Sequence, residues 1–169
     1  MTYLIWLLRI IHIVGGVFWI GSAMMSFFFI GPTVAATGEA GQKFMGYLIN
    51  NLKISNRIAA AAGSTILAGV ILFALDARAG AAWLRSSFAI GLSIGAGFAL
   101  IGFIFGLLVG RINKTMAQLG AQMQGKPSAE QRKQIQALQN QQSTYSRISA
   151  ITLILAVIFM SIARYLGIG

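Results

Sequence analysis

The sequence predicts an all-α integral membrane protein: a four-transmembrane-helix bundle with a cytoplasmic helical hairpin extending the third and fourth helices. Two observations support this fold class. Of the 169 residues, 57% are hydrophobic and only 9% are charged, whereas soluble domains carry roughly 25% charged residues. The apolar residues also occur in four long blocks, and a helix needs about 20 mostly apolar residues to cross the hydrocarbon of a bilayer. We therefore expect one membrane domain that covers residues 1–169.

The four predicted spans are about residues 3–30, 58–75, 88–109 and 148–166. The first block lacks a basic region before it and a small-residue cleavage site after it, which favours a retained helix over a signal peptide. Arg9 and Arg164 lie inside the outer blocks but near their ends, where a long side chain can reach the interface.

Between the first two spans, the sequence predicts an amphipathic helix at about residues 40–52. Phe44, Leu48 and Leu52 recur at helical spacing, with polar residues between them. Such a helix can lie on the inner leaflet of the membrane. It can equally well cover the end of the bundle.

The predicted cytoplasmic hairpin is about residues 111–147. Helix-forming residues run without a break on both sides of the turn at Gly125–Ser128, and Pro127 and Ser128 resemble a helix start. Side chains predicted to face one another across the hairpin are Met116, Leu119 and Met123 on one arm and Ile135 and Leu138 on the other.

The net charge of +10 reflects membrane orientation and does not indicate a nucleic-acid partner, because the basic residues flank the apolar blocks. The loops on one side carry Lys43, Lys53, Arg57, Arg111, Lys114, Lys126, Arg132, Lys133 and Arg147. The other side carries only Arg9, Arg78, Arg85 and Arg164. Loops rich in lysine and arginine stay on the cytoplasmic side of a membrane. We therefore expect a prokaryotic plasma (inner) membrane protein with both termini extracytoplasmic.

Glycine is frequent in the third span, at positions 91, 95, 102, 106 and 110. This small-xxx-small spacing lets helix backbones approach closely in lipid. We expect tight packing within the chain, within a homo-oligomer or against a partner membrane subunit. A glycine-lined slot for a flat cofactor is the alternative.

His12 is the single histidine of the chain and lies inside the first span. An ionisable residue in a membrane span is a candidate functional residue, and His12 lies roughly 13 Å from the outer end at 1.5 Å per residue. Gly16 and Trp19 follow on the same helical face, an arrangement that suits a planar ligand such as haem. The alternative is a histidine that is hydrogen-bonded to a neighbouring helix.

Further residues extend the haem interpretation. Arg9 lies one turn outward of His12, and Arg9 and Arg164 suit the propionates of a haem because arginine binds carboxylates well. Met160 is a weak candidate for a second axial ligand, beside five-coordinate iron or ligation by two copies of the chain. A copper site is disfavoured, because the chain has no cysteine and no cluster of histidine or methionine.

The ends of the chain resemble a bacterial superfamily that includes the copper-resistance protein D family, the HemJ-type protoporphyrinogen oxidases and uncharacterised four-helix families. The resemblance rests on the segments 9–14 (RIIHIV), 18–21 (FWIG), Gly31-Pro32 and 160–165 (MSIARY). It implies a haem b on His12. Unlike the oxidase-like branch, this chain has no further histidine and no lysine within a span, which argues against protoporphyrinogen oxidation and copper import.

Two functions follow as expectations. The first is a haem-binding membrane protein with a redox or electron-transfer role, in which His12 is the iron ligand. The second is a non-catalytic membrane subunit or scaffold that packs within an oligomer or a larger complex through its glycine faces and its hairpin.

Overall fold

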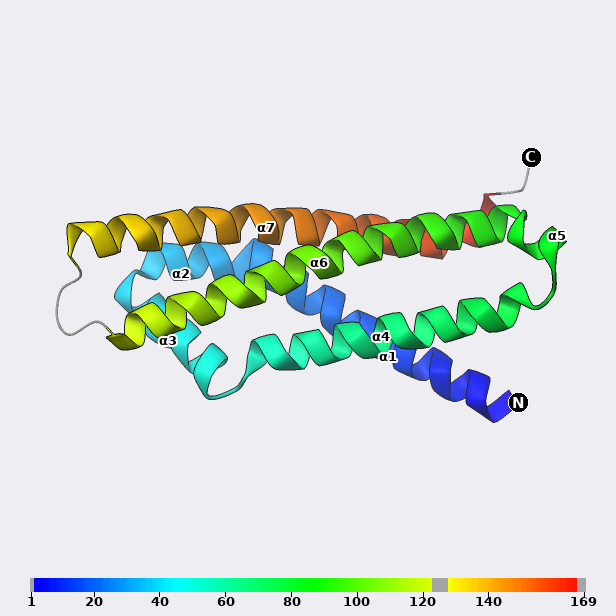
Figure 1. Ribbon diagram of the computed structural model, residues 1–169, viewed down its shortest axis with the longest axis horizontal. Coiled ribbons are helices and arrows are strands. Elements are labelled where there is room, and N and C mark those ends of the chain that lie inside the picture. Colours follow the sequence, from blue (N-terminus) through cyan, green and yellow to red (C-terminus); the bar gives the residue numbers. More distant parts are fainter. Residues whose placement is uncertain (1, 123–127, 167–169) are drawn as a thin grey trace.

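A computed structural model of the chain describes residues 2–122 and 128–166, and the regular secondary structure of these residues consists of helices joined by short turns (Figure 1). The helices are α1 (Thr2–Met25), η1 (Ser26–Ile30), α2 (Gly31–Thr37), α3 (Glu39–Asn50), α4 (Ile54–Ala77), α5 (Ala81–Leu84), α6 (Ser87–Gln122), α7 (Ala129–Ile162) and η2 (Ala163–Tyr165). In the described part of the chain, four helical segments are long and apolar enough to cross a membrane. The chain is therefore a multi-pass membrane protein.

The first of these segments is a continuous rod in which α1, η1 and α2 follow one another without a break from Thr2 to Thr37. η1 is a turn of π-helix, in which the N–H of Gly31 donates to the carbonyl of Ser26. Pro32 comes next, and proline cannot donate a hydrogen bond to the carbonyl four residues earlier. The π turn widens the helix at this point, so that the chain passes Pro32 without ending the helix.

α3 covers one end of the bundle, where it contacts α2, α4 and α6. Gly38 separates α2 from α3 with a φ of +55°, a conformation that favours glycine. On α3, Met45 and Leu48 face the interior of the molecule, whereas Phe44 and Tyr47 are exposed.

α6 and α7 pack against each other along their length. At 1.5 Å per residue each is roughly 50 Å long, well beyond the ~30 Å of a hydrocarbon core, so both helices are longer than one membrane crossing requires. α7 begins with a capping box: Ser128 accepts from the N–H of Gln131, and the side chain of Gln131 accepts from the N–H of Ser128. The predicted turn residues before Ser128, and Met123, lie outside the described residues.

Two side-chain hydrogen bonds join α6 to α7. The hydroxyl of Ser149 donates to the carbonyl of Gly102 over 2.9 Å, and Nε2 of Gln142 donates to Oδ1 of Asn113 over 2.6 Å. Ser149 and Asn113 are both buried. These bonds set the antiparallel register of the two helices.

The glycines of α6 divide into two groups. A Cβ atom at Gly91, Gly95 or Gly102 would lie within 2.7–2.9 Å of atoms of α7 or η2, so these three glycines permit the close approach of the helices. At Gly106 the nearest atom, Oγ of Ser149, would be 3.7 Å away, and at Gly110 nothing lies within 4 Å. The tight packing of these glycines against α7 therefore ends between Gly102 and Gly106, although the two helices stay in contact as far as Asn113.

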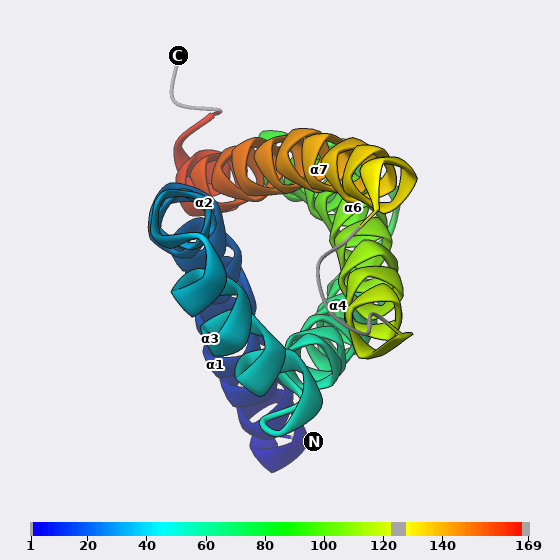
Figure 2. The ribbon, with the colours of Figure 1, turned by 90° about the vertical axis from the view of Figure 1, so that its left-hand side faces the viewer.

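The bundle consists of two helix pairs, α1 with α4 and α6 with α7. Seen along its length, the bundle has α1 and α4 on one side and α6 and α7 on the other (Figure 2). A core of Trp19, Ala62 and Leu153 connects the pairs, and the Trp19 ring meets the edge of Phe103 with centroids 6.0 Å apart.

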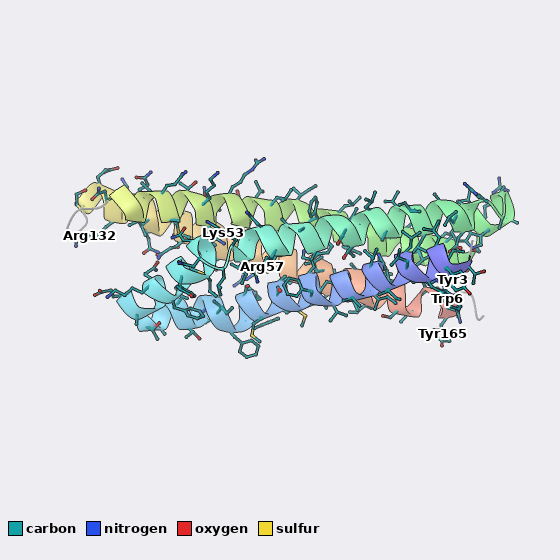
Figure 3. All side chains as sticks on the ribbon, turned by 90° about the horizontal axis from the view of Figure 1, so that it is seen from below. Tyr3, Trp6, Lys53, Arg57, Arg132 and Tyr165 are labelled. Atoms are coloured by element: carbon teal, nitrogen blue, oxygen red, sulfur yellow. The ribbon has the colours of Figure 1, made fainter. Side chains whose placement is uncertain are left out.

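The two ends of the molecule differ in their side chains. Tyr3, Trp6 and Tyr165 lie at the end that carries the start of α1 and the end of α7 (Figure 3). Lys53, Arg57 and Arg132 lie toward the opposite end. Aromatic residues at one helix end and basic residues at the other are typical of helices that cross a membrane.

Candidate functional site

His12 lies in the contact between α1 and α4. Its Nδ1 is 2.8 Å from the carbonyl oxygen of Thr65, and its ring packs against Gly69, where a Cβ atom would lie 2.7 Å from Cε1. Because a carbonyl can only accept, Nδ1 carries the proton in the neutral ring. Nε2 then has a free lone pair, and no residue in the described part of the chain bonds to it.

Thr65 contributes a second polar group to this contact. Its side chain is 6% exposed, and its Oγ1 is buried with no hydrogen-bond partner among the described residues. It lies directly against Gly15, because a Cβ atom at that glycine would overlap the hydroxyl. Glycine at position 15 therefore allows α1 to approach α4 at the level of His12.

Gly16 and Trp19, predicted to continue a cofactor face from His12, have other surroundings. A Cβ atom at Gly16 would lie 3.5 Å from Cγ2 of Thr65, so α4 occupies the space in front of this glycine. Trp19 is 3% exposed and belongs to the core between the helix pairs. Thr65 therefore fills the space in front of Gly16, whereas Trp19 belongs to the core and also lines a cavity.

The other candidate ligands are distributed over the two helix pairs. Arg9 is exposed on α1, and Arg164 is exposed on η2, which packs against α6. Met160 packs on α6, since its Cγ would lie 2.7 Å from a Cβ atom at Gly95. Figure 2 shows the N-terminal end of α1 and the C-terminal end of α7 on opposite sides of the bundle.

A feature that the sequence analysis gave only as an alternative, a glycine-lined space, is a cavity of about 1190 Å³. It lies between the rod of α1, η1 and α2, together with α3 and the start of α4, on one side and the seam of α6 and α7 on the other. Gly106 and Gly110 line it, and neither glycine is tightly packed against α7. The glycine spacing was the one signal for it, although the same spacing also predicted a tight contact.

Histidine, cysteine and carboxylate side chains form no group of three that could hold a metal ion within residues 2–122 and 128–166. A metal ion bound to His12 would therefore have one protein ligand of these types. A prosthetic group would supply its other ligands. Haem iron with one histidine ligand is an arrangement of this kind.

Comparison of the chain with protein-family models, with curated proteins and with solved structures gives no match. The functional conclusions below therefore rest on the sequence and on the geometry.

Proposed function

We propose that this membrane protein binds a haem b through Nε2 of His12 and has a redox or electron-transfer role. The observation that carries the proposal is the hydrogen bond between Nδ1 of His12 and the carbonyl of Thr65. A metal-bound histidine almost always donates its other ring N–H in this way, which sets the tautomer and the ring orientation and raises the basicity of the ligand.

The residues around His12 fit such a ligand in part. The Thr65 carbonyl orients the ring, Gly69 leaves room for the ring against α4, and Nε2 has no other partner in the described chain. Arg9, one turn outward and exposed, is available to a propionate. A bound haem supplies one-electron chemistry, and the chain supplies one ligand and a positive charge close to it. Gly16 lies against Thr65 and Trp19 packs in the central core, so we assign neither residue a role in this proposal.

The alternative function is a non-catalytic membrane subunit or scaffold within a homo-oligomer or a larger complex. The fit between the His12 ring and Gly69 favours it, because this contact and the bond to Thr65 explain the histidine as a residue that joins two helices. Under this alternative the glycine contacts of α6 and the projecting ends of α6 and α7 are the main structural features.

Absorbance of the purified protein separates the two functions. Protein made with ample haem should show a Soret band, and His12→Ala should lose it while still inserting into the membrane. Thr65→Val is the matched control: it removes an unpaired hydroxyl from the same contact and leaves the carbonyl that accepts from His12, so the band should remain. A colourless wild-type protein, or a coloured His12→Ala variant, would exclude His12 as the ligand.

We also propose that the protein lies in a prokaryotic inner membrane with both termini outside and the ends of α6 and α7 forming a cytoplasmic hairpin. The distribution of basic residues supports this orientation. A reporter enzyme that works only in the cytoplasm should be inactive when fused after Gly169 and active when inserted at residues 124–126. The opposite pattern would invert the topology.

A further inference from the structure

The large cavity is apolar at the end that lies deep in the bundle. Trp19, Ile58 and Phe103 line it there, and the contact between the Trp19 and Phe103 rings closes it toward the core. A wall of this kind attracts hydrocarbon and does not hold water well, because ordered water needs two to four polar partners.

The other end of the cavity is basic. Arg111 and Lys114 enter its lining from α6, and Arg147 enters from α7. Helical side chains tilt toward the N-terminus of their helix, so Arg147 leans along α7 toward the hairpin, in the direction of the other two cations. The amides of several glutamine and asparagine residues complete this end.

These three cations have no counter-ion within the described chain. The whole sequence contains only three acidic residues, Glu39, Asp76 and Glu130, and none of them lines the cavity. The ion pair that the described residues form joins Glu39 to Lys43 on α3. Positive charges next to an apolar space, without internal neutralisation, favour an anionic occupant.

The dimensions of the cavity match a lipid more closely than a metabolite. Its volume of about 1190 Å³ exceeds the roughly 300–1,000 Å³ of ordinary small-molecule sites. Along α6 the lining runs from Phe103 to Met116, roughly 20 Å at 1.5 Å per residue. This is about half of the ~40–45 Å thickness of a bilayer with its headgroup regions, which is the depth of one leaflet.

We propose that this cavity binds one acidic phospholipid from the leaflet at the hairpin end of the molecule. Its acyl chains lie along the apolar wall beside Phe103, and its phosphate lies among Arg111, Lys114 and Arg147. The proposal concerns a different part of the molecule from His12 and does not depend on haem.

Lipid binding to delipidated protein in a neutral detergent tests the proposal. Native mass spectrometry should show one molecule of phosphatidylglycerol per chain, bound at least roughly tenfold more tightly than phosphatidylcholine with the same acyl chains. This factor corresponds to a single hydrogen bond to a charged group. Inorganic phosphate at the same concentration should not displace the lipid, because it lacks the apolar part.

Charge variants locate the headgroup. Replacing both Arg111 and Arg147 with glutamine should weaken phosphatidylglycerol binding by roughly tenfold or more. The double variant Arg132→Gln with Lys133→Gln is the matched control. It also removes two positive charges, both at positions of α7 outside the cavity lining. If both double variants lose the same affinity for phosphatidylglycerol, the lipid is attracted to the basic surface in general and the proposal is overturned.

A glycine variant locates the acyl chains without changing charge. Gly110 lines the cavity, and a Cβ atom there meets nothing within 4 Å, so Gly110→Leu should fold and fill part of the space. Gly97→Leu is the control, at an exposed glycine of α6 that also has open space around it. Gly110→Leu should reduce lipid binding and Gly97→Leu should not. Unchanged binding to Gly110→Leu, equal binding of phosphatidylcholine, or displacement by phosphate alone would each refute a lipid in this cavity.

Discussion

Adding one methyl group at Gly102 tests whether α6 and α7 approach each other as closely as the structure describes. In Gly102→Ala the new Cβ would lie 2.7 Å from Cγ and 2.8 Å from Cδ2 of Leu153, and 3.0 Å from Oγ1 of Thr152. Leu153 is completely buried, so its side chain has no free space into which it can rotate. One of the helices must therefore shift.

The size of the effect follows from a comparison with Gly97→Ala, on the same helix, where a Cβ atom meets nothing within 4 Å. Both variants gain about 1 kcal/mol of helix propensity, and this gain cancels between them. Overpacking of the core costs about 1–3 kcal/mol in Gly102→Ala alone. The free energies of unfolding should therefore differ by about 1–3 kcal/mol, with Gly102→Ala the less stable variant.

Thermal unfolding of both variants in detergent, followed by circular dichroism, measures this difference. At roughly 2–4 °C per kcal/mol for a chain of this size, Gly102→Ala should unfold at a Tm at least about 2 °C below that of Gly97→Ala. If Gly102→Ala unfolds at the same or a higher temperature, α6 and α7 are further apart at this level and the argument from the glycine contact is wrong.

Three further predictions concern side-chain contacts of α7 and α3. Gln142→Ala leaves the buried amide of Asn113 without its partner, which should lower the free energy of unfolding by about 1–3 kcal/mol. Amide hydrogen exchange near both residues should become faster, and unchanged exchange would show that the hydrogen bond does not stabilise the two helices. Ser128→Ala removes the N-cap of α7 and should cost about 1 kcal/mol, with faster exchange confined to the first turn as the check. The hydrogen bond and charge of Lys43 lower the pKa of Glu39. The stabilisation of α3 by this ion pair is therefore fully present above the ordinary pKa of a glutamate and is lost as the pH falls through the lowered pKa. Exchange protection of α3 should fall in that acidic window in the wild type and stay constant in Glu39→Gln.

The spans and helix starts could be predicted from the sequence because they depend on local properties. In lipid the backbone hydrogen bonds of a spanning segment must be made within that segment, so a long apolar block predicts a helix before any partner is known. The same holds at Ser128, where the capping box joins residues three positions apart. Pro32 is an exception, since proline at the end of an apolar block suggests a helix end, yet the π turn before it lets the helix continue to Thr37.

Of the candidate site, the sequence pointed to His12 but not to the groups around it. A single histidine in an apolar block is conspicuous in any sequence, but its partner is a backbone carbonyl 53 positions away, and a carbonyl has no signature in a sequence. Gly16 and Trp19 share a helical face with His12, but they meet Thr65 and the central core instead of a cofactor. Spacing along one helix determines which residues share a face and says nothing about what covers it.

The glycines of α6 separate what the sequence by itself determined from what the tertiary structure decided. Their four-residue spacing determined that Gly102, Gly106 and Gly110 share one face. Only the packing decided that Gly102 meets Leu153 while Gly106 and Gly110 border a large cavity. The physical reason is that the surroundings of each glycine depend on the side chains that reach its level from other helices, including Leu153 of α7 at Gly102 and Trp19 of α1 and Met45 and Leu48 of α3, which line the cavity with Gly106 and Gly110. The same residue type at the same spacing therefore closes a contact at one level and opens a lipid-sized space two turns further on.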